Sequence, residues 1–398
     1  MKKMYPLIAL AVCSMALRTF IALRIDSVPV VDFARFYDTA RAIAVRDWAF
    51  NRTPYFTIWA YQTGFALYEA IVIRLSGSFA KTALIVLNCL YITGTNVFVY
   101  LIAGEITESR KCAVFAGVLY LLIPEVYTLA PVLTNQHLAL FLLMSGFYLA
   151  LNGGSRAIAV AAVLFALGNC IRPLGVIAVA AVLLFNLLIC IIRKEKPLPL
   201  VKTCVILLAA YMLTLGAANA VVIGSGLNPN GLANNDPLWK FAAGLDYEHK
   251  GAWSRELTEA VYAIEDAELR KAAELDYIAA HRPQSIQQWS ELFLGKIRTL
   301  WLENPDLQWS FTEPPTWSAT FYAVNIRVNI ALWVMALIAS TIIWKRYNTA
   351  AILPGIALLL YAGAHLLIEV QPRYRDFALP LLCILASAVV KPRGWVKN

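Results

Sequence analysis

The polar segment 31–38, which follows the first hydrophobic stretch, carries two carboxylates in an otherwise apolar part of the chain. A partly desolvated carboxylate at a boundary between water and lipid could act as a general base toward an acceptor hydroxyl or amine, and Asp32 is the candidate for that role. The alternative is that Asp32 is only the N-cap of a helix, a position that Asp favours. Asp38 lies on a different helical face; it is a further candidate for the site, but it is predicted to pair with Arg41 or Arg35. Arg35 and Arg41 each follow an aspartate by three residues, a spacing that permits pairing.

Residues that could bind a phosphate group lie in two other places. Arg172 falls inside an apolar stretch, where an unpaired charge costs several kcal/mol, so it needs a protein carboxylate or a lipid phosphate as its partner. Arg373, Tyr374 and Arg375 follow a later apolar stretch, and a guanidinium group matches phosphate geometry bidentately. Pairing of these arginines with a nearby carboxylate such as Glu369 explains them equally well from the sequence alone.

Further polar side chains could join the same site. Glu125 and His137 lie at the ends of two apolar stretches, and a divalent metal could serve as a cofactor there. A metal would favour several converging carboxylates, however, and this connection offers Glu125 alone. Lys240 begins a long polar loop and could contact a ligand. His365 lies one turn before Glu369 and could contribute, although a histidine in a helix is more often a packing residue.

Composition identifies the class of protein that must position these side chains. The chain has 398 residues, of which 60% are hydrophobic and 15% charged, whereas soluble domains have roughly 45–50% and 25%. It is therefore predicted to be an all-α integral membrane protein. The net charge of +9 comes from short clusters of Lys and Arg between apolar stretches, which indicates membrane topology rather than nucleic-acid binding.

About ten stretches are predicted to span the membrane, since a hydrocarbon core of about 30 Å needs roughly 20 apolar residues. They are residues 4–23, 82–103, 112–130, 137–152, 157–171, 174–192, 200–223, 324–344, 349–368 and 376–390. Residues 56–75 include Glu69 and Arg74 and are predicted to form a re-entrant or surface-lying helix instead. The basic clusters then fall on one side, which predicts a plasma-membrane protein with both termini in the cytoplasm.

Three polar regions face the other side in this topology. The first outer loop, 24–81, contains an amphipathic segment that is predicted to lie in the interface plane; its apolar face consists of Phe33, Phe36, Tyr37, Ala40, Ile43, Ala44 and Trp48. The second region is a loop of about a hundred residues, with a helix predicted over 256–280. The third is the connection 369–376. The chain thus divides into a transmembrane module (1–224), an extracytoplasmic subdomain (225–323) and a second transmembrane module (324–398).

This arrangement resembles the GT-C superfamily of glycosyltransferases that use polyprenyl-phosphate sugars. The shared features are an acidic residue in the first outer loop, interfacial helices, many spans, a late large outer loop and an Arg-Tyr motif before the last span. The nearest resemblance is to family 39, the bacterial protein mannosyltransferases and aminoarabinose transferases. The segments 56–64 and 239–245 also look like Firmicutes members of that family.

The resemblance implies a GT-C-like fold and a specific chemistry. Asp32 would be the first-loop catalytic aspartate that activates the acceptor, and Arg172, Arg373 and Tyr374 would lie near the donor phosphate. The expected reaction is an inverting transfer of a hexose or pentose, at the outer leaflet, to a glycan, lipid or protein of the cell envelope. The chain departs from the mannosyltransferase pattern because Phe33, rather than Glu, follows Asp32. That departure leaves the class of acceptor open.

Two other functions are compatible with parts of the sequence. A flippase or transporter for lipid-linked sugars would show repeated halves and polar helices at the bilayer midplane, whereas the polar residues here collect at one end of the spans. An oligosaccharide polymerase or ligase would depend on arginines and a histidine in a large outer loop, and His249, His281 and Arg282 could serve that chemistry.

Overall fold

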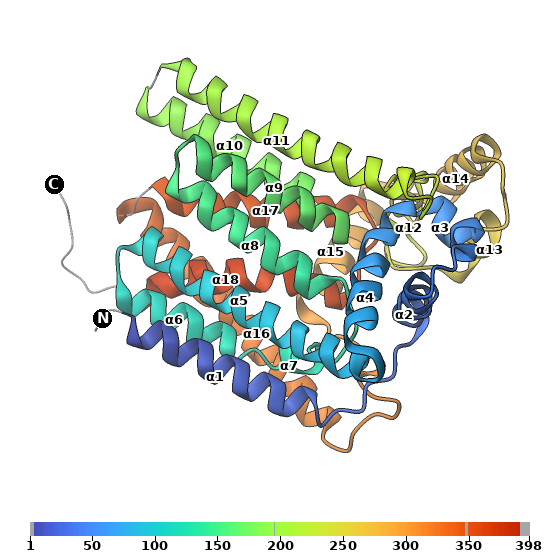
Figure 1. Cartoon of the computed structure of the whole chain (residues 1–398). Coiled ribbons are helices and arrows are strands. Elements are labelled where there is room, and N and C mark those ends of the chain that lie inside the picture. Colours follow the sequence, from blue (N-terminus) through green and yellow to red (C-terminus); the bar gives the residue numbers. More distant parts are fainter. Residues whose placement is uncertain (1–3, 195, 347–348, 391–398) are drawn as a thin grey trace.

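The computed structural model describes residues 4–194, 196–346 and 349–390, and these residues form helices and connections without a β-strand. Long apolar helices run side by side in a bundle (Figure 1). The bundle consists of α1 (Tyr5–Ala22), α5 (Ala80–Thr107), α6 (Arg110–Leu121), α8 (Gln136–Asn152), α9 (Ser155–Ile171), α10 (Gly175–Arg193), α11 (Pro197–Gly224), α16 (Ser318–Arg346), α17 (Ile352–Leu367) and α18 (Ala378–Ala386). The prediction of an all-α polytopic membrane protein is confirmed.

The helices of the bundle differ in whether their length and hydropathy alone suit a membrane crossing. Six stretches of the described chain are long and apolar enough to cross a membrane, and α8 and α9 are shorter apolar helices. The predicted span 112–130 is wrong as a single helix. It divides into α6 and α7 (Pro124–Leu129), because Pro124 begins a new helix and Ile123 before it is extended.

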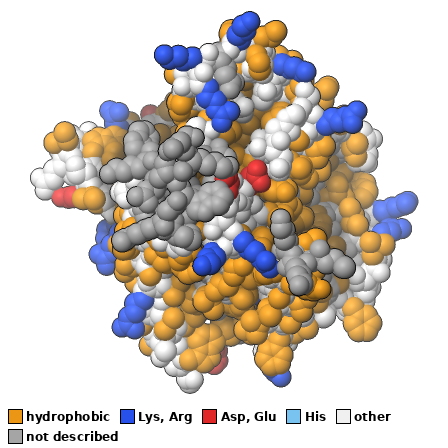
Figure 2. All heavy atoms as spheres, turned by 90° about the vertical axis from the view of Figure 1, so that its left-hand side faces the viewer, with side chains coloured by type: hydrophobic (Ala, Val, Ile, Leu, Met, Phe, Trp, Pro, Cys, Tyr) orange, Lys and Arg blue, Asp and Glu red, His pale blue; other side chains and the backbone are white. Residues whose placement is uncertain are grey.

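The two ends of the bundle carry different elements. The helices α2 (Val31–Ala44), α3 (Pro54–Ile58) and α4 (Thr63–Ser76) lie at one end, and α4 runs across that end rather than along the bundle (Figure 1). This agrees with a surface-lying segment at 56–75. Lys and Arg side chains surround the opposite end (Figure 2). The positive-inside rule predicts that this opposite end is cytoplasmic.

The apolar face of α2 is covered by protein. Phe33, Phe36 and Ile43 are buried, and Phe36 makes edge-to-face contact with Phe65 of α4 at 5.6 Å between ring centroids. The amphipathic helix was expected to turn this face toward the lipid interface. It packs on α4 instead, because the two helices together bury both apolar faces.

Arg18 is a charged side chain inside the bundle that is hydrogen-bonded to its own helix and to α6. Arg18 of α1 is fully buried and donates hydrogen bonds to Ser14 and, at 3.1 Å, to the carbonyl oxygen of Tyr120. The short helix α18 is buried along its whole length, and the core around it includes side chains of α5, α16 and α17. The bundle therefore provides a rigid base for the residues at its polar end.

The long outer loop folds into small helices, α12 (Trp239–Gly244), α13 (Arg255–Val261), α14 (Ala267–His281) and α15 (Ile286–Leu302). The helix predicted over 256–280 is wrong as a single element, since α13 ends and α14 begins again within it. The break is local: the Asp266 carboxylate caps α14 by accepting hydrogen bonds from the backbone N–H groups of Glu268 and Leu269 at 3.0 and 2.9 Å.

Candidate active site

A cavity of about 800 Å³ lies where the first outer loop, the long outer loop and the segment after α17 meet. Its size is typical of sites that bind small molecules. Its lining includes Asp32 and Arg35 of α2, Lys240 of α12, His249 and Trp253 in the next loop, and Glu369, Arg373 and Tyr374 after α17. The structure thus brings together predicted site residues that are separated by more than three hundred positions in the sequence.

Asp32 lies in the first turn of α2 with its carboxylate open to the cavity. The alternative that it caps the helix is wrong, because Val30 occupies the N-cap position. The Asp32 side chain is 41% exposed and forms a 3.8 Å ion pair with Arg35. Burial and the hydrogen-bonded Asp32 carboxylate raise the pKa of the Tyr55 phenol well above its usual range, so Tyr55 stays a hydrogen-bond donor that can orient Asp32.

The backbone directly before Asp32 is strained. Val31 has φ of +49°, a conformation that β-branched residues rarely adopt. Such a residue costs about 1–3 kcal/mol and persists where the surrounding structure enforces it, often at functional sites. Asp38, by contrast, is 73% exposed, lies within 4.0 Å of Arg41 and does not line the cavity. The pairing predicted for Asp38 is confirmed.

Lys240 and Glu369 form an ion pair in the cavity wall. The Glu369 carboxylate is almost fully buried, contacts the Lys240 ammonium group and accepts a 2.6 Å hydrogen bond from Gln371. Burial alone would raise the pKa of Glu369, but Lys240 and Gln371 hold it below its usual range. Tyr374 donates a 3.4 Å hydrogen bond to the same carboxylate. Glu369 is therefore an ionised group that positions Lys240 and Tyr374.

Arg373 is held by aromatic rings. Its guanidinium lies 5.1 Å from the ring centroid of Phe33 and 4.7 Å from that of Trp309, and its Nε donates a 2.8 Å hydrogen bond to Gln371. Within the described part of the chain, no carboxylate lies within ion-pair distance of Arg373. A rigid guanidinium with unused donors in a cavity is suited to bind a phosphate.

Arg172 directly follows α9 and does not line the large cavity. It donates a 2.9 Å hydrogen bond to Asn135 and lies 5.2 Å from the ring centroid of Tyr374, which does line it. With Tyr374 and the buried Asp376 it lines a small pocket beside the cavity. Among the described residues it has no carboxylate within ion-pair distance, so both partners proposed from the sequence, a protein carboxylate and a lipid phosphate, stay open.

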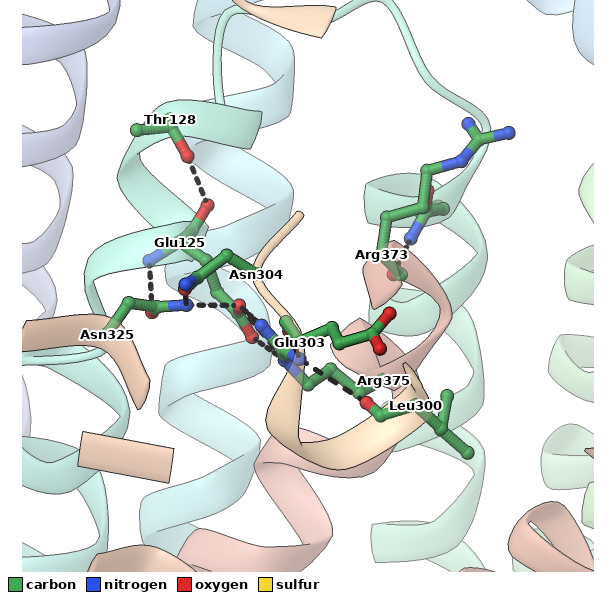
Figure 3. Close-up of polar contacts among 9 residues, drawn as sticks. Glu125, Thr128, Leu300, Glu303, Asn304, Asn325, Arg373 and Arg375 are labelled. Carbon is green, nitrogen blue, oxygen red and sulfur yellow. Dashed lines mark hydrogen bonds and ion pairs between the residues drawn. The ribbon is translucent and has the colours of Figure 1, made fainter. Parts of the chain in front are cut away.

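Arg375 points away from the cavity, opposite to Arg373 (Figure 3). It is buried and forms a bidentate ion pair with Glu125, whose carboxylate also accepts a 2.8 Å hydrogen bond from Asn325. Arg375 further donates to the carbonyl oxygens of Leu300 and Glu303. Its donors are therefore occupied by protein, and the predicted additional site residue Glu125 is its structural partner.

The two histidines predicted as additional site residues lie outside the large cavity, and His365 lines a neighbouring apolar groove. His137 is buried and its Nε2 contacts the carbonyl oxygen of Leu129 at 3.0 Å. His365 is also buried, with Nδ1 2.9 Å from the carbonyl oxygen of Tyr361. Neither lines the large cavity. The described residues contain no group of three or more His, Cys, Asp or Glu residues that could hold a metal ion.

Some residues at the cavity could not be identified as site residues from the sequence. Tyr55, Trp309 and Gln371 contact predicted site residues only because distant segments meet. His249 lines the cavity and pairs with buried Asp246 at 2.8 Å. The spacing of three residues between Asp246 and His249 permits such a pair, but it also occurs on ordinary exposed helices.

Comparison with solved structures identifies the fold. Superposition on the archaeal oligosaccharyltransferase AglB from Archaeoglobus fulgidus, in complex with an inhibitory peptide and a dolichol-phosphate, gives a TM-score of 0.53. The match covers 95% of this chain and 50% of AglB at 14% sequence identity. The chain has the fold of AglB. The GT-C resemblance is thus confirmed for the fold, and the chain spans about half the length of the AglB chain.

Other comparisons add little to this result. The oligosaccharyltransferase of Archaeoglobus fulgidus in the apo form gives a TM-score of 0.50 at 13% identity, and the match covers 95% of this chain and 50% of that one. ArnT from Cupriavidus metallidurans bound to undecaprenyl phosphate covers 96% of this chain and 78% of its own, at 12% identity, but its TM-score of 0.38 supports no argument. No protein-family model and no curated protein matches the sequence.

Proposed function

We propose that the protein is a membrane glycosyltransferase that transfers a hexose or pentose from a polyprenyl-phosphate donor to a glycan, lipid or protein acceptor. The observation that carries this proposal is the cavity in which the open carboxylate of Asp32 and the unpaired guanidinium of Arg373 meet. A base and an anion-binding group in one cavity are what sugar transfer from a lipid phosphate requires. The shared fold with AglB supports the same class of reaction.

The proposed reaction is a single displacement with inversion at the anomeric carbon. Asp32 accepts the proton of the acceptor hydroxyl, whose oxygen forms the new bond to the anomeric carbon. The bond between that carbon and the phosphate oxygen breaks, and its electron pair leaves with the lipid phosphate. Arg373, with Arg172 and Lys240, offsets the charge that develops on the departing phosphate.

An apolar groove next to the cavity could hold the lipid chain of the donor. It has a volume of about 460 Å³ and is lined mainly by apolar side chains of α15, α16 and α17, including Leu300, Trp333 and Leu359. Lys296 also lines the groove and donates a 2.9 Å hydrogen bond to the carbonyl oxygen of Ile368, directly before Glu369. The groove therefore ends beside the wall to which we assign the phosphate.

The proposed location of this reaction is the outer leaflet of the plasma membrane. The cavity lies at the end of the bundle opposite to the gathered Lys and Arg side chains of Figure 2. If that basic end is cytoplasmic, the cavity opens outside the cell, where lipid-linked sugars meet acceptors of the cell envelope.

A transfer assay tests the proposal. The purified full-length protein would be incubated with labelled polyprenyl-phosphate sugars and membrane extract, and the products would be separated and analysed by NMR. We expect a new glycosidic bond whose anomeric configuration is opposite to that of the donor. Retention of configuration would contradict the displacement mechanism. Movement of the lipid across vesicles without any new glycosidic bond would show a transporter instead.

A further inference from the structure

The proposed reaction does not use the histidine of the long outer loop that faces the cavity. His249 has 37% of its side chain exposed, and its Nδ1 lies 2.8 Å from Oδ2 of the fully buried Asp246. The backbone N–H of His249 donates a second hydrogen bond, of 3.0 Å, to Oδ1 of the same carboxylate. A buried carboxylate thus fixes both the position and the orientation of the imidazole ring.

Asp246 is itself held in place by the helices behind it. The phenol of Tyr277 on α14 donates a 2.6 Å hydrogen bond to Asp246 and lies 3.4 Å from the hydroxyl of Ser254. Ser254 accepts a 3.1 Å hydrogen bond from the backbone N–H of Leu257 and so caps α13. The network therefore joins the His249 loop to α13 and α14 as one unit.

This geometry determines which hydrogen-bonding group of the His249 ring is available to a ligand in the cavity. In its neutral form the ring donates from Nδ1 to the carboxylate, which leaves the lone pair of Nε2 as a hydrogen-bond acceptor. Within the described residues Nε2 has no hydrogen-bond partner. A hydroxyl group of a ligand in the cavity can donate a hydrogen bond at that position.

Aromatic faces complete the same wall. Trp253, four residues after His249, is 51% exposed and lines the cavity. Tyr262, directly after α13, also lines it and lies against Trp59, with 5.9 Å between ring centroids and 31° between the planes. Flat aromatic rings beside a fixed hydrogen-bond acceptor match a sugar ring, which has apolar C–H groups on its faces and hydroxyls around its edge.

We propose that this outer-loop wall binds a saccharide as the acceptor substrate, with a sugar hydroxyl donating to Nε2 of His249. Asp246 and Tyr277 are positioning residues for that contact. The role of the sugar as acceptor rests on the proposed function, whereas its binding does not.

The test is a binding measurement that needs no catalysis. The full-length protein in nanodiscs, without donor, would be titrated with methyl glycosides of glucose, galactose, mannose, N-acetylglucosamine and arabinose, and binding followed by saturation-transfer NMR. We expect at least one glycoside to bind. His249→Ala should weaken its binding about tenfold, the effect of one hydrogen bond of about 1.4 kcal/mol, and Trp253→Ala should weaken it as well.

Matched controls distinguish the loss of a direct contact with the glycoside from a general disturbance of the fold. Trp317→Ala changes an exposed tryptophan that does not line the cavity, and it should leave binding unchanged. A deoxy glycoside that lacks the hydroxyl bound by His249 should lose affinity for the unaltered protein but lose no more for His249→Ala. A change that only disturbed the fold would not give this pattern.

Three results would overturn the inference: no glycoside binds, binding survives His249→Ala and Trp253→Ala unchanged, or a Ser/Thr peptide competes fully for the site. If a glycoside binds as expected but no sugar is ever transferred to it, the proposed function fails and the saccharide site stands. The two failures are therefore distinguishable.

Discussion

Two arginines in the segment after α17 have opposite surroundings although one residue separates them. Arg373 is held by aromatic rings and an amide at the cavity, whereas Arg375 is buried against Glu125. From the sequence, phosphate binding was a candidate role for both arginines. Which of them points into the cavity and which into the core depends on the turn that begins at Pro372. At this scale the sequence shows which side chains could bind phosphate, but it does not show which of them point into the cavity.

Replacing each arginine by methionine should separate stability from activity. Arg375→Met leaves the Glu125 carboxylate buried without its ion-pair partner, which costs about 3–5 kcal/mol, so we expect a large fall in Tm. Arg373→Met removes the phosphate-binding group and should lower kcat by about 10²–10³ with little change in Tm. Thermal melts and the transfer assay on both variants check this. Equal destabilisation by the two variants would contradict it.

Lys296 should make stability depend on pH. Burial lowers the pKa of its ammonium group to about 7, so between about pH 7 and the ordinary lysine value near 10.4 the unfolded chain binds a proton that the folded protein does not. The free energy of unfolding should therefore rise with pH in that window, by at most about 1.4 kcal/mol per pH unit. Lys296→Met should flatten this slope in thermal melts, whereas Lys250→Met should not. An unchanged slope in Lys296→Met would show that Lys296 stays charged.

At the scale of elements, hydropathy located the long helices and periodicity located α2. The break between α13 and α14 is local, but the helical spacing of Leu257, Val261 and Ile264 hides the cap at Asp266. What depends on partners is the protein that covers the apolar face of α2. An amphipathic stripe has the same sequence pattern whether lipid or a second helix covers it. The cavity is likewise a product of docking, since its walls come from four separate segments.

Close packing between α12 and the end of α17 should be required for the Lys240–Glu369 pair. A Cβ atom at Gly244 would lie 2.3 Å from the carbonyl oxygen of Leu367, so Gly244→Ala must push the two elements apart. We expect a loss of about 1–3 kcal/mol in stability and a lower transfer rate. Gly224→Ala is the control, because no atom lies within 4 Å of its Cβ position. Similar behaviour of the two variants would refute the close docking.

At the scale of the whole molecule, the helices α2 and α12, which contribute to the cavity wall, lie at the end of the bundle opposite to the turn between α8 and α9 (Figure 1). Single cysteines at Gln287 in the long outer loop and at Arg156 between α8 and α9 can test which end faces outward. A membrane-impermeant maleimide applied to intact cells should label Gln287→Cys but not Arg156→Cys until the cells are opened. Labelling of Arg156→Cys in intact cells would reverse the predicted topology and place the cavity inside.

The central claim is that the Asp32 carboxylate is the base of a sugar transfer. The most direct measurement compares the transfer rates of Asp32→Asn and Asp38→Asn, two isosteric changes on the same helix, of which only the first alters the cavity. We predict that Asp32→Asn lowers kcat by about 10²–10⁴ with unchanged Tm and donor binding, while Asp38→Asn keeps the full rate. Full activity of Asp32→Asn would contradict the account.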